Sequence, residues 1–156
     1  MQHRWRMIGM VILAVAPLRA DSGWPRFRGP RGDGIAPEAQ PPVTWNETNH
    51  VAWRADVPGR GRSSPVLLEN WIWLTTALER GVQRTRIGPD DMQTAEHVTI
   101  EVLSLDRSTG QPVWQTALRE IDQPEPVHWL NSWATPTPVV EPGRVAGGDD
   151  RVRQRG

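Results

Sequence analysis

Cysteine, lysine and tyrosine are all absent from the 156 residues of this chain. Without cysteine the protein has no disulfide, no thiolate metal site and no cysteine nucleophile. The four histidines are scattered and show no zinc-binding spacing. The sequence therefore predicts no metal site, and no pair of acid–base or nucleophilic residues stands out as catalytic.

Net charge is also lacking, because 18 basic residues balance 18 acidic ones. All of the basic residues are arginines, and they are spread from Arg4 to Arg155 rather than clustered. A neutral chain without a basic patch creates no long-range field that attracts nucleic acid. We therefore expect no nucleic-acid partner.

Long apolar runs are missing as well. The longest, residues 7–18, has twelve positions, whereas a membrane span needs about 20. Arg4 and Arg6 precede this run, and Leu18-Arg19-Ala20 are predicted to precede the cleavage site. This pattern predicts a signal peptide at residues 1–20, export to the periplasm or cell envelope, and no stable membrane span after cleavage. An uncleaved anchor is the alternative.

Turn-forming residues are abundant instead, with 14 glycines and 15 prolines, and no window has a helical period. Residues 21–50 are predicted to be an irregular lead-in. Short runs with strand character follow at residues 51–57, 64–68, 71–76, 98–105 and 112–118. The run 71–76 is apolar on both faces, which predicts a strand covered on both sides. Residues 79–96 are predicted to form a polar surface excursion.

The segment 103–114 reads as two strands joined by a tight turn. Asp106 can accept hydrogen bonds from backbone N–H groups inside the turn, and Thr109 can do so more weakly. Gly110 supplies the left-handed conformation that closes a bulged hairpin. Pro112 cannot donate to a ladder, which places its strand at a sheet edge.

Two stretches of sequence recur. Residues 51–57 match residues 112–118, and residues 64–67 match residues 137–140. Each copy of the repeat therefore consists of a tryptophan-containing strand followed, after a loop, by a Ser/Thr-Pro-Val strand. Such a repeat predicts a stacked architecture of similar units. Trp53 and Trp114 are predicted to lie over the turn of a neighbouring unit and dock one unit on the next.

These residues resemble the repeat of the pyrroloquinoline-quinone-type β-propeller family, small-x-Asp-x-x-Thr-Gly-x-x-x-Trp. The matching positions are Ser104 (where alanine is usual), Asp106, Thr109, Gly110 and Trp114. Residues 24–30 and 128–138 are similar to exported propeller proteins of planctomycete-like bacteria. The resemblance implies an all-β fold over residues 51–145, with one four-stranded blade and flanking strands of an incomplete quinoprotein-like propeller.

For function, the resemblance implies a non-catalytic scaffold with a structural or binding role, protein partners in the cell envelope, and no cofactor in this part of the propeller. The alternative is the N-terminal piece of a quinone-dependent alcohol dehydrogenase whose catalytic blades lie elsewhere. Only that enzyme would need pyrroloquinoline quinone and calcium. Such enzymes commonly carry a vicinal cysteine pair, and this chain has no cysteine.

The resemblance stops after Val145. Residues 146–156 lack the alternation of a blade strand and are predicted to be an aberrant or out-of-frame tail, with a natural polar tail as the alternative. A lone blade leaves its apolar faces uncovered. We therefore expect a weakly folded product in which residues 71–74 are exposed and prone to aggregation.

Overall fold

The computed structural model of the chain describes residues 23–37, 39–148 and 150–153. The predicted signal peptide lies outside these residues. In the described part every regular element is a strand, so the predicted all-β class is confirmed, and no helix there could cross a membrane. The strands are β1 (Val66–Leu68), β2 (Trp71–Arg80), β3 (Gln83–Ile87), β4 (Asp90–Thr94), β5 (His97–Asp106), β6 (Pro112–Asp122), β7 (Val127–His128), β8 (Val139–Glu141), β9 (Arg144–Gly147) and β10 (Asp150–Arg153).

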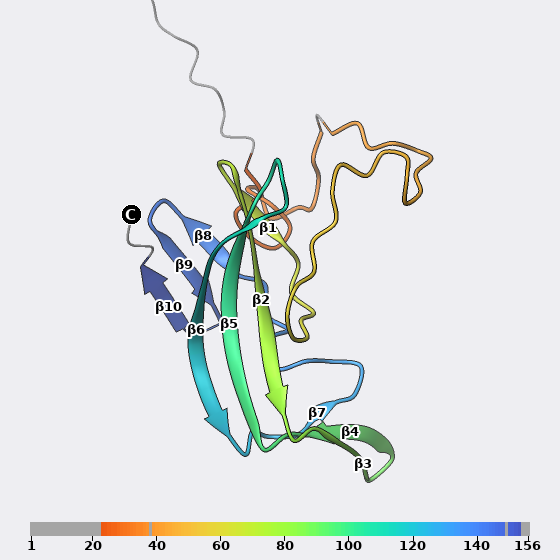
Figure 1. Cartoon of the computed structure of the whole chain (residues 1–156), viewed down its shortest axis with the longest axis vertical. Helices are drawn as coiled ribbons and strands as arrows, with labels where there is room; N and C mark the ends of the chain where they lie inside the picture. The colour runs from red at the N-terminus through yellow and green to blue at the C-terminus, as the bar shows by residue number, and fades with distance from the viewer. Residues whose placement is uncertain (1–22, 38, 149, 154–156) are drawn as a thin grey trace, which may run out of the picture.

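The main sheet has four antiparallel strands in the order β1-β2-β5-β6 (Figure 1). β1 pairs with β2 and β5 with β6 as neighbours in the chain, whereas β2 pairs with β5 across the intervening β3 and β4. The turn between β1 and β2 contains Glu69 at φ 54°. The long strands β2 and β5 pair without a break from Trp71↔Asp106 to Arg80↔His97. This is the four-stranded sheet that the sequence predicts.

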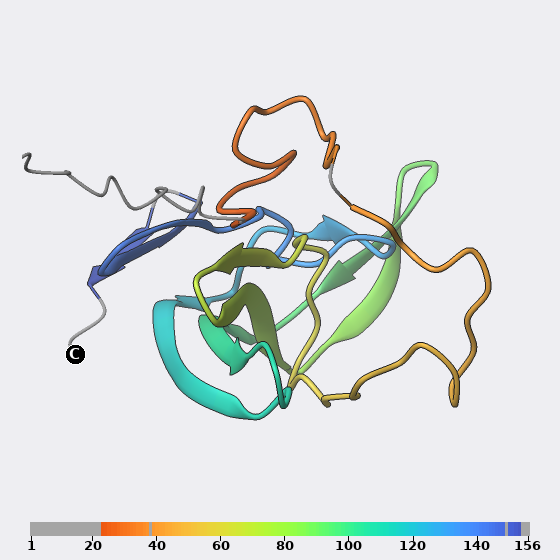
Figure 2. The same cartoon turned by 90° about the horizontal axis from the view of Figure 1, so that it is seen from above.

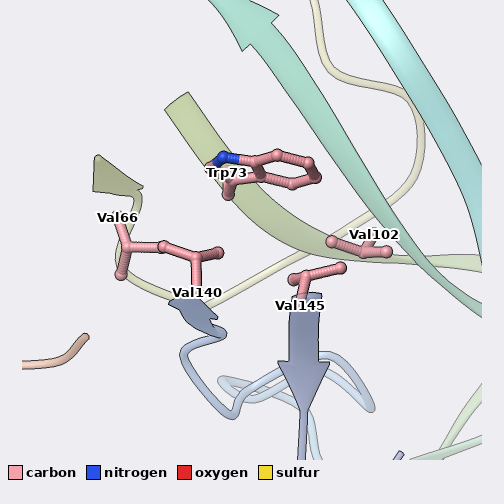
Figure 3. Packing of buried hydrophobic residues seen from close by; sticks show 5 residues of the cluster. All are labelled: Val66, Trp73, Val102, Val140 and Val145. Carbon is pink, nitrogen blue, oxygen red and sulfur yellow. The ribbon is translucent and has the colours of Figure 1, made fainter. Parts of the chain in front are cut away.

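One face of the main sheet is covered by β8 and β9. Val66, Trp73 and Val102 of the main sheet pack against Val140 and Val145, which reach them from the two covering strands (Figure 3). All five side chains are at most 3% exposed. Alternation along β2 sends every second side chain to this face, so the cluster follows directly from the strand period.

The opposite face is covered by residues 51–59. The hydroxyl of Thr76 donates to the carbonyl of Pro58, and the backbone at Gly59 passes so close to Ala77 that a Cβ there would lie 2.4 Å from its carbonyl oxygen. Leu103, on this same face, is 1% exposed. The prediction that residues 71–76 are covered on both sides is therefore confirmed, and the expectation that residues 71–74 are exposed is wrong.

The predicted strand at residues 51–57 is not a strand. Its side chains alternate as a strand's do, with Trp53, Ala55 and Val57 half-buried and their neighbours exposed. No ladder pairs it with another element of the described chain. The reason is its position, because it crosses the face of the main sheet instead of lying along an edge.

The predicted polar excursion at residues 79–96 is more regular than expected. It contains a hairpin of β3 and β4, closed by Gly88 at φ 63°. The hairpin is extended to a three-stranded sheet by β7, with Met92 opposite His128 (Figure 1). Pairing with a strand from beyond β6 organises a segment whose composition alone suggests a loop.

The third sheet has the order β10-β9-β8. Residues predicted to be an aberrant tail take part in it, since β9 ends at Gly147 and β10 pairs with β9 from Asp150↔Gly147 to Arg153↔Arg144. The sheet therefore continues past the point where the sequence resemblance stops. It contains three strands, and β10 lies at its edge.

Candidate docking site at the 106–111 turn

The turn between β5 and β6 is closed by both backbone and side-chain hydrogen bonds. The N–H of Gly110 donates to the carbonyl of Asp106 at 2.8 Å, and the N–H of Asp106 donates to the carbonyl of Gln111 at 2.9 Å. Oδ1 of Asp106 accepts from the N–H groups of Ser108 and Thr109, both at 2.9 Å. Gly110 has φ 73°, in the left-handed region that favours glycine.

The carboxylate at the centre of this turn is stabilised in its ionised form. The hydroxyl of Ser108 and the donors of Thr109 hold the pKa of Asp106 below its usual range. Its second oxygen, Oδ2, accepts from Nδ2 of Asn70 at 2.8 Å, and the N–H of Arg107 donates to the Asn70 carbonyl at 2.9 Å. These bonds join the 106–111 turn to the β1–β2 turn at the same end of the main sheet.

Trp53 lies directly on this turn. Its indole Nε1 donates to the carbonyl of Arg107 at 3.0 Å. Its ring covers Gly110 so closely that a Cβ on the glycine would lie 2.4 Å from Cε3 of the indole. Glycine is therefore required here for two reasons, the positive φ and the ring contact. The tryptophan docks the 51–59 segment on the end of the main sheet.

Trp114 has the same place in the sequence repeat and a different environment. Its ring meets that of Trp73 edge-on, with centroids 5.7 Å apart and an interplanar angle of 63°, beside the cluster that β8 and β9 cover. Ser104 lies opposite Trp114 in the ladder. The docking of Trp114 on the turn of a neighbouring unit stays a prediction.

The hydroxyl of Ser104 is buried without a hydrogen-bond partner in the described part of the chain. The residue is 1% exposed and packs on the same face as Trp73. An unpaired buried hydroxyl costs free energy that an alanine would not. Alanine is usual at this position in the propeller repeat that the sequence resembles.

A polar cluster at the other end of the main sheet was missed by sequence reasoning. Nη1 of Arg60 donates to Oε1 of Gln93 and lies 3.4 Å from Oε2 of Glu79. Its Nη2 donates to the carbonyls of Trp129 and Asn131, both at 3.3 Å. One guanidinium thus ties together β2, the β3–β4 hairpin and the loop after β7.

Glu79 is the unusual member of this cluster. Burial raises the pKa of its carboxyl, and the neighbouring Arg60 guanidinium opposes that rise only in part. Its Oε1 has no partner among the described residues, and the same is true of Nε2 of Gln93. The sequence did contain a signal, because Glu79 follows Thr75 and Ala77 on the buried face of β2 at the strand period of two.

The two tryptophans after β7 have structural contacts. The guanidinium of Arg84 lies 4.1 Å from the ring centroid of Trp129, and it also pairs with Asp91 at 2.8 Å. Nε1 of Trp133 donates to the carbonyl of Glu125 at 2.9 Å, and its ring packs near Ile100. A cleft of about 190 Å³ lies beside Trp133. Within the described ranges no three His, Asp or Glu side chains converge as metal ligands.

Comparison with known proteins finds no matching family model, no similar curated protein and no similar solved structure. The all-β fold is therefore established by the structure itself. The likeness of residues 104–114 to a propeller repeat remains a prediction.

Proposed function

We propose that this chain is an exported β-propeller-like repeat protein, and that its blade-like sheet acts as a scaffold with a structural or binding role and no catalysis of its own. The observation that carries this proposal is the contact of Trp53 with the 106–111 turn. Trp53 comes from a segment outside the main sheet, and its indole covers Gly110 and donates to the carbonyl of Arg107. In the proposed repeat, this contact docks one unit on the next.

The size of this contact suits a structural role. A tryptophan ring offers roughly 200 Å² of surface. Half-burial at about 25 cal/mol per Å² gives roughly 2–3 kcal/mol, an upper limit because the unfolded chain also hides some surface. The indole hydrogen bond to Arg107 adds about 1 kcal/mol. A contribution of this size is a large fraction of the stability of a small domain.

Export is the second part of the proposal, with protein partners in the cell envelope. It rests on the charged start and apolar run within residues 1–20. The test is to express the chain with a C-terminal tag in a Gram-negative host, fractionate the cells, and determine the N-terminal residue by mass spectrometry. We expect periplasmic protein that begins near Asp21. Replacing Val11 and Leu13 by arginine should retain the protein in the cytoplasm; an equal distribution for both forms would refute export.

The claim that this chain has no catalysis of its own is tested with the cofactor of the quinone-dependent dehydrogenases. The purified chain is titrated with pyrroloquinoline quinone in the presence of calcium, while tryptophan fluorescence reports binding and an artificial electron acceptor reports alcohol oxidation. We expect no saturable quenching and no dye reduction above the rate with quinone alone. Saturable binding with alcohol-dependent dye reduction would overturn the scaffold proposal in favour of the enzyme.

A further inference from the structure

Three polar side chains are joined by hydrogen bonds at the end of the main sheet away from the 106–111 turn. Nε2 of His97 lies 3.2 Å from Oγ1 of Thr99, and Nδ1 of the same ring lies 2.7 Å from Oδ1 of Asp122. A hydroxyl, an imidazole and a carboxylate in this order form the arrangement that activates a hydroxyl nucleophile. The sequence does not reveal this triad of Thr99, His97 and Asp122, because Asp122 lies 25 residues after His97.

The strand geometry brings the three residues together. His97 and Thr99 are two positions apart in β5, so their side chains share a face of the sheet. Asp122 of β6 lies directly opposite His97 in the ladder, and its carboxylate therefore reaches the ring across the strand pair. The register is unbroken from His97↔Asp122 to Ile100↔Arg119. A regular stretch of ladder thus sets the spacing of the triad.

The carboxylate decides which ring nitrogen of His97 carries the proton. An ionised carboxylate only accepts hydrogen bonds, so Nδ1 of His97 donates to Asp122. In the neutral ring Nε2 is then an acceptor, and the hydroxyl of Thr99 donates to it. This is the tautomer in which His97 can take the hydroxyl proton when Oγ1 attacks an electrophile.

The triad lies on the face of the main sheet opposite to β8 and β9. Val102 packs against those two strands, and side chains alternate along β5, so Thr99 faces the other way. Figure 2 shows the blue C-terminal strands on one side of the main sheet. On the face of the triad, residues 51–59 reach as far as Thr76, which pairs with Glu101. The triad lies beyond that pair, toward the end of the sheet.

The triad is accessible from solvent. The side chain of His97 is 23% exposed and that of Asp122 is 85% exposed. Thr99 is half-buried. The imidazole is therefore held by its surroundings, while the hydroxyl stays within reach of a small molecule in solution.

We infer that Thr99 is an acylation site, whose hydroxyl takes an acyl group from an activated ester with His97 as general base and Asp122 as the positioning residue. Oγ1 attacks the carbonyl carbon and forms the new C–O bond, while its proton passes to Nε2 of His97. The bond to the leaving alcohol breaks, and the leaving oxygen takes the electron pair and then the proton from the ring. The products are a threonine ester on the chain and the free alcohol. This single transfer involves no turnover, so it goes beyond the proposed scaffold role without contradicting it.

The composition of the chain makes this inference easy to test. The sequence has no lysine, cysteine or tyrosine, so these competing nucleophiles are absent. The purified protein is incubated with p-nitrophenyl acetate near neutral pH, and peptide mapping by mass spectrometry locates the acetyl group. We expect a stable acetyl group on Thr99, together with a burst of p-nitrophenol that is stoichiometric with the protein. Acetylation confined to the N-terminus, or spread evenly over many hydroxyls, would overturn the inference.

Variants of the nucleophile and the base separate chemistry from background. Thr99→Val should abolish the burst, whereas Thr85→Val, at an exposed position of β3, is the matched control and should keep it. His97→Gln should slow the burst about 100-fold or more, which is the size of a general-base contribution. An unchanged burst in His97→Gln or in Thr99→Val would show the inference to be wrong.

The role of Asp122 needs a measurement that a merely structural residue would not affect. Asp122→Asn keeps the shape of the side chain and removes the charge that fixes the tautomer of His97. We expect a slower burst for Asp122→Asn and a rate near that of the parent for Asp122→Glu, with the far-UV circular dichroism of both variants unchanged. Equal rates for the parent and Asp122→Asn would refute the positioning role. None of these measurements depends on quinone binding, so the acylation site and the scaffold role fail separately.

Discussion

Replacement of Gly110 by alanine tests the docking contact more directly than any other change. The new Cβ would lie 2.4 Å from Cε3 of Trp53, so the indole or the turn has to move. The φ of 73° adds the strain of a left-handed non-glycine residue, about 1–2 kcal/mol. Loss of the ring contact adds roughly 2–3 kcal/mol. We expect a total loss of about 3–5 kcal/mol in the free energy of unfolding.

Gly88 provides a matched control in the same molecule. Its φ is 63°, yet a Cβ there meets nothing within 4 Å. Gly88→Ala should therefore show the backbone strain alone, about 1–2 kcal/mol. Urea unfolding followed by far-UV circular dichroism measures both variants, because the free energy comes from the midpoint and slope of the transition and not from the signal amplitude to which the tryptophans contribute.

A double-mutant cycle separates ring contact from strain. Trp53→Ala alone should cost about 3 kcal/mol, for the half-buried ring and its hydrogen bond to Arg107. In the Trp53→Ala background, Gly110→Ala should cost only its strain, so the two losses should fall short of additivity by roughly 2 kcal/mol. Equal losses for the Gly110 and Gly88 variants, together with additivity in the cycle, would refute docking of Trp53 on the turn.

Three further changes test the buried and charged groups. Ser104→Ala should raise the free energy of unfolding by about 1 kcal/mol in urea melts, because it removes a buried hydroxyl that has no partner in the described chain; a clear loss would show that the hydroxyl is satisfied. The raised pKa of Glu79 means that the folded state binds this proton more tightly than the unfolded state does. Its contribution to the free energy of unfolding is therefore favourable in acid and is lost as pH rises through the folded pKa. Glu79→Gln should remove this part of the pH dependence of stability, and an unchanged dependence would contradict the expectation. The lowered pKa of Asp106 has the opposite effect, because its stabilising contribution is present above the unfolded pKa and is lost as pH falls through the folded pKa. In thermal melts, Asp106→Asn should be less stable than the parent at pH 7, and the difference should shrink in strong acid.

Local chemistry explains why much of the main sheet is predictable from sequence. The alternation in residues 71–76 and 98–105 follows the strand period, and the 106–111 turn has the residue types that its backbone requires. The hairpin at residues 83–94 was less visible, because its order depends on pairing with β7 more than thirty residues away. The Arg60 cluster joins three elements far apart in sequence, and no local pattern specifies such a meeting.

The segment 51–57 shows where local reasoning reaches its limit. Its alternation predicts correctly which side chains are covered, since Trp53, Ala55 and Val57 are half-buried and their neighbours are exposed. It does not predict the missing backbone pairing. Whether the segment pairs depends on an edge that only another element can offer, and no sheet of the described chain includes it.

The two repeat tryptophans show the same limit. Trp53 covers a turn that belongs to the main sheet, whereas Trp114 lies beside Trp73 at the boundary with β8 and β9. Both residues have the same place in the internal repeat, and their contacts differ because the elements that surround them differ.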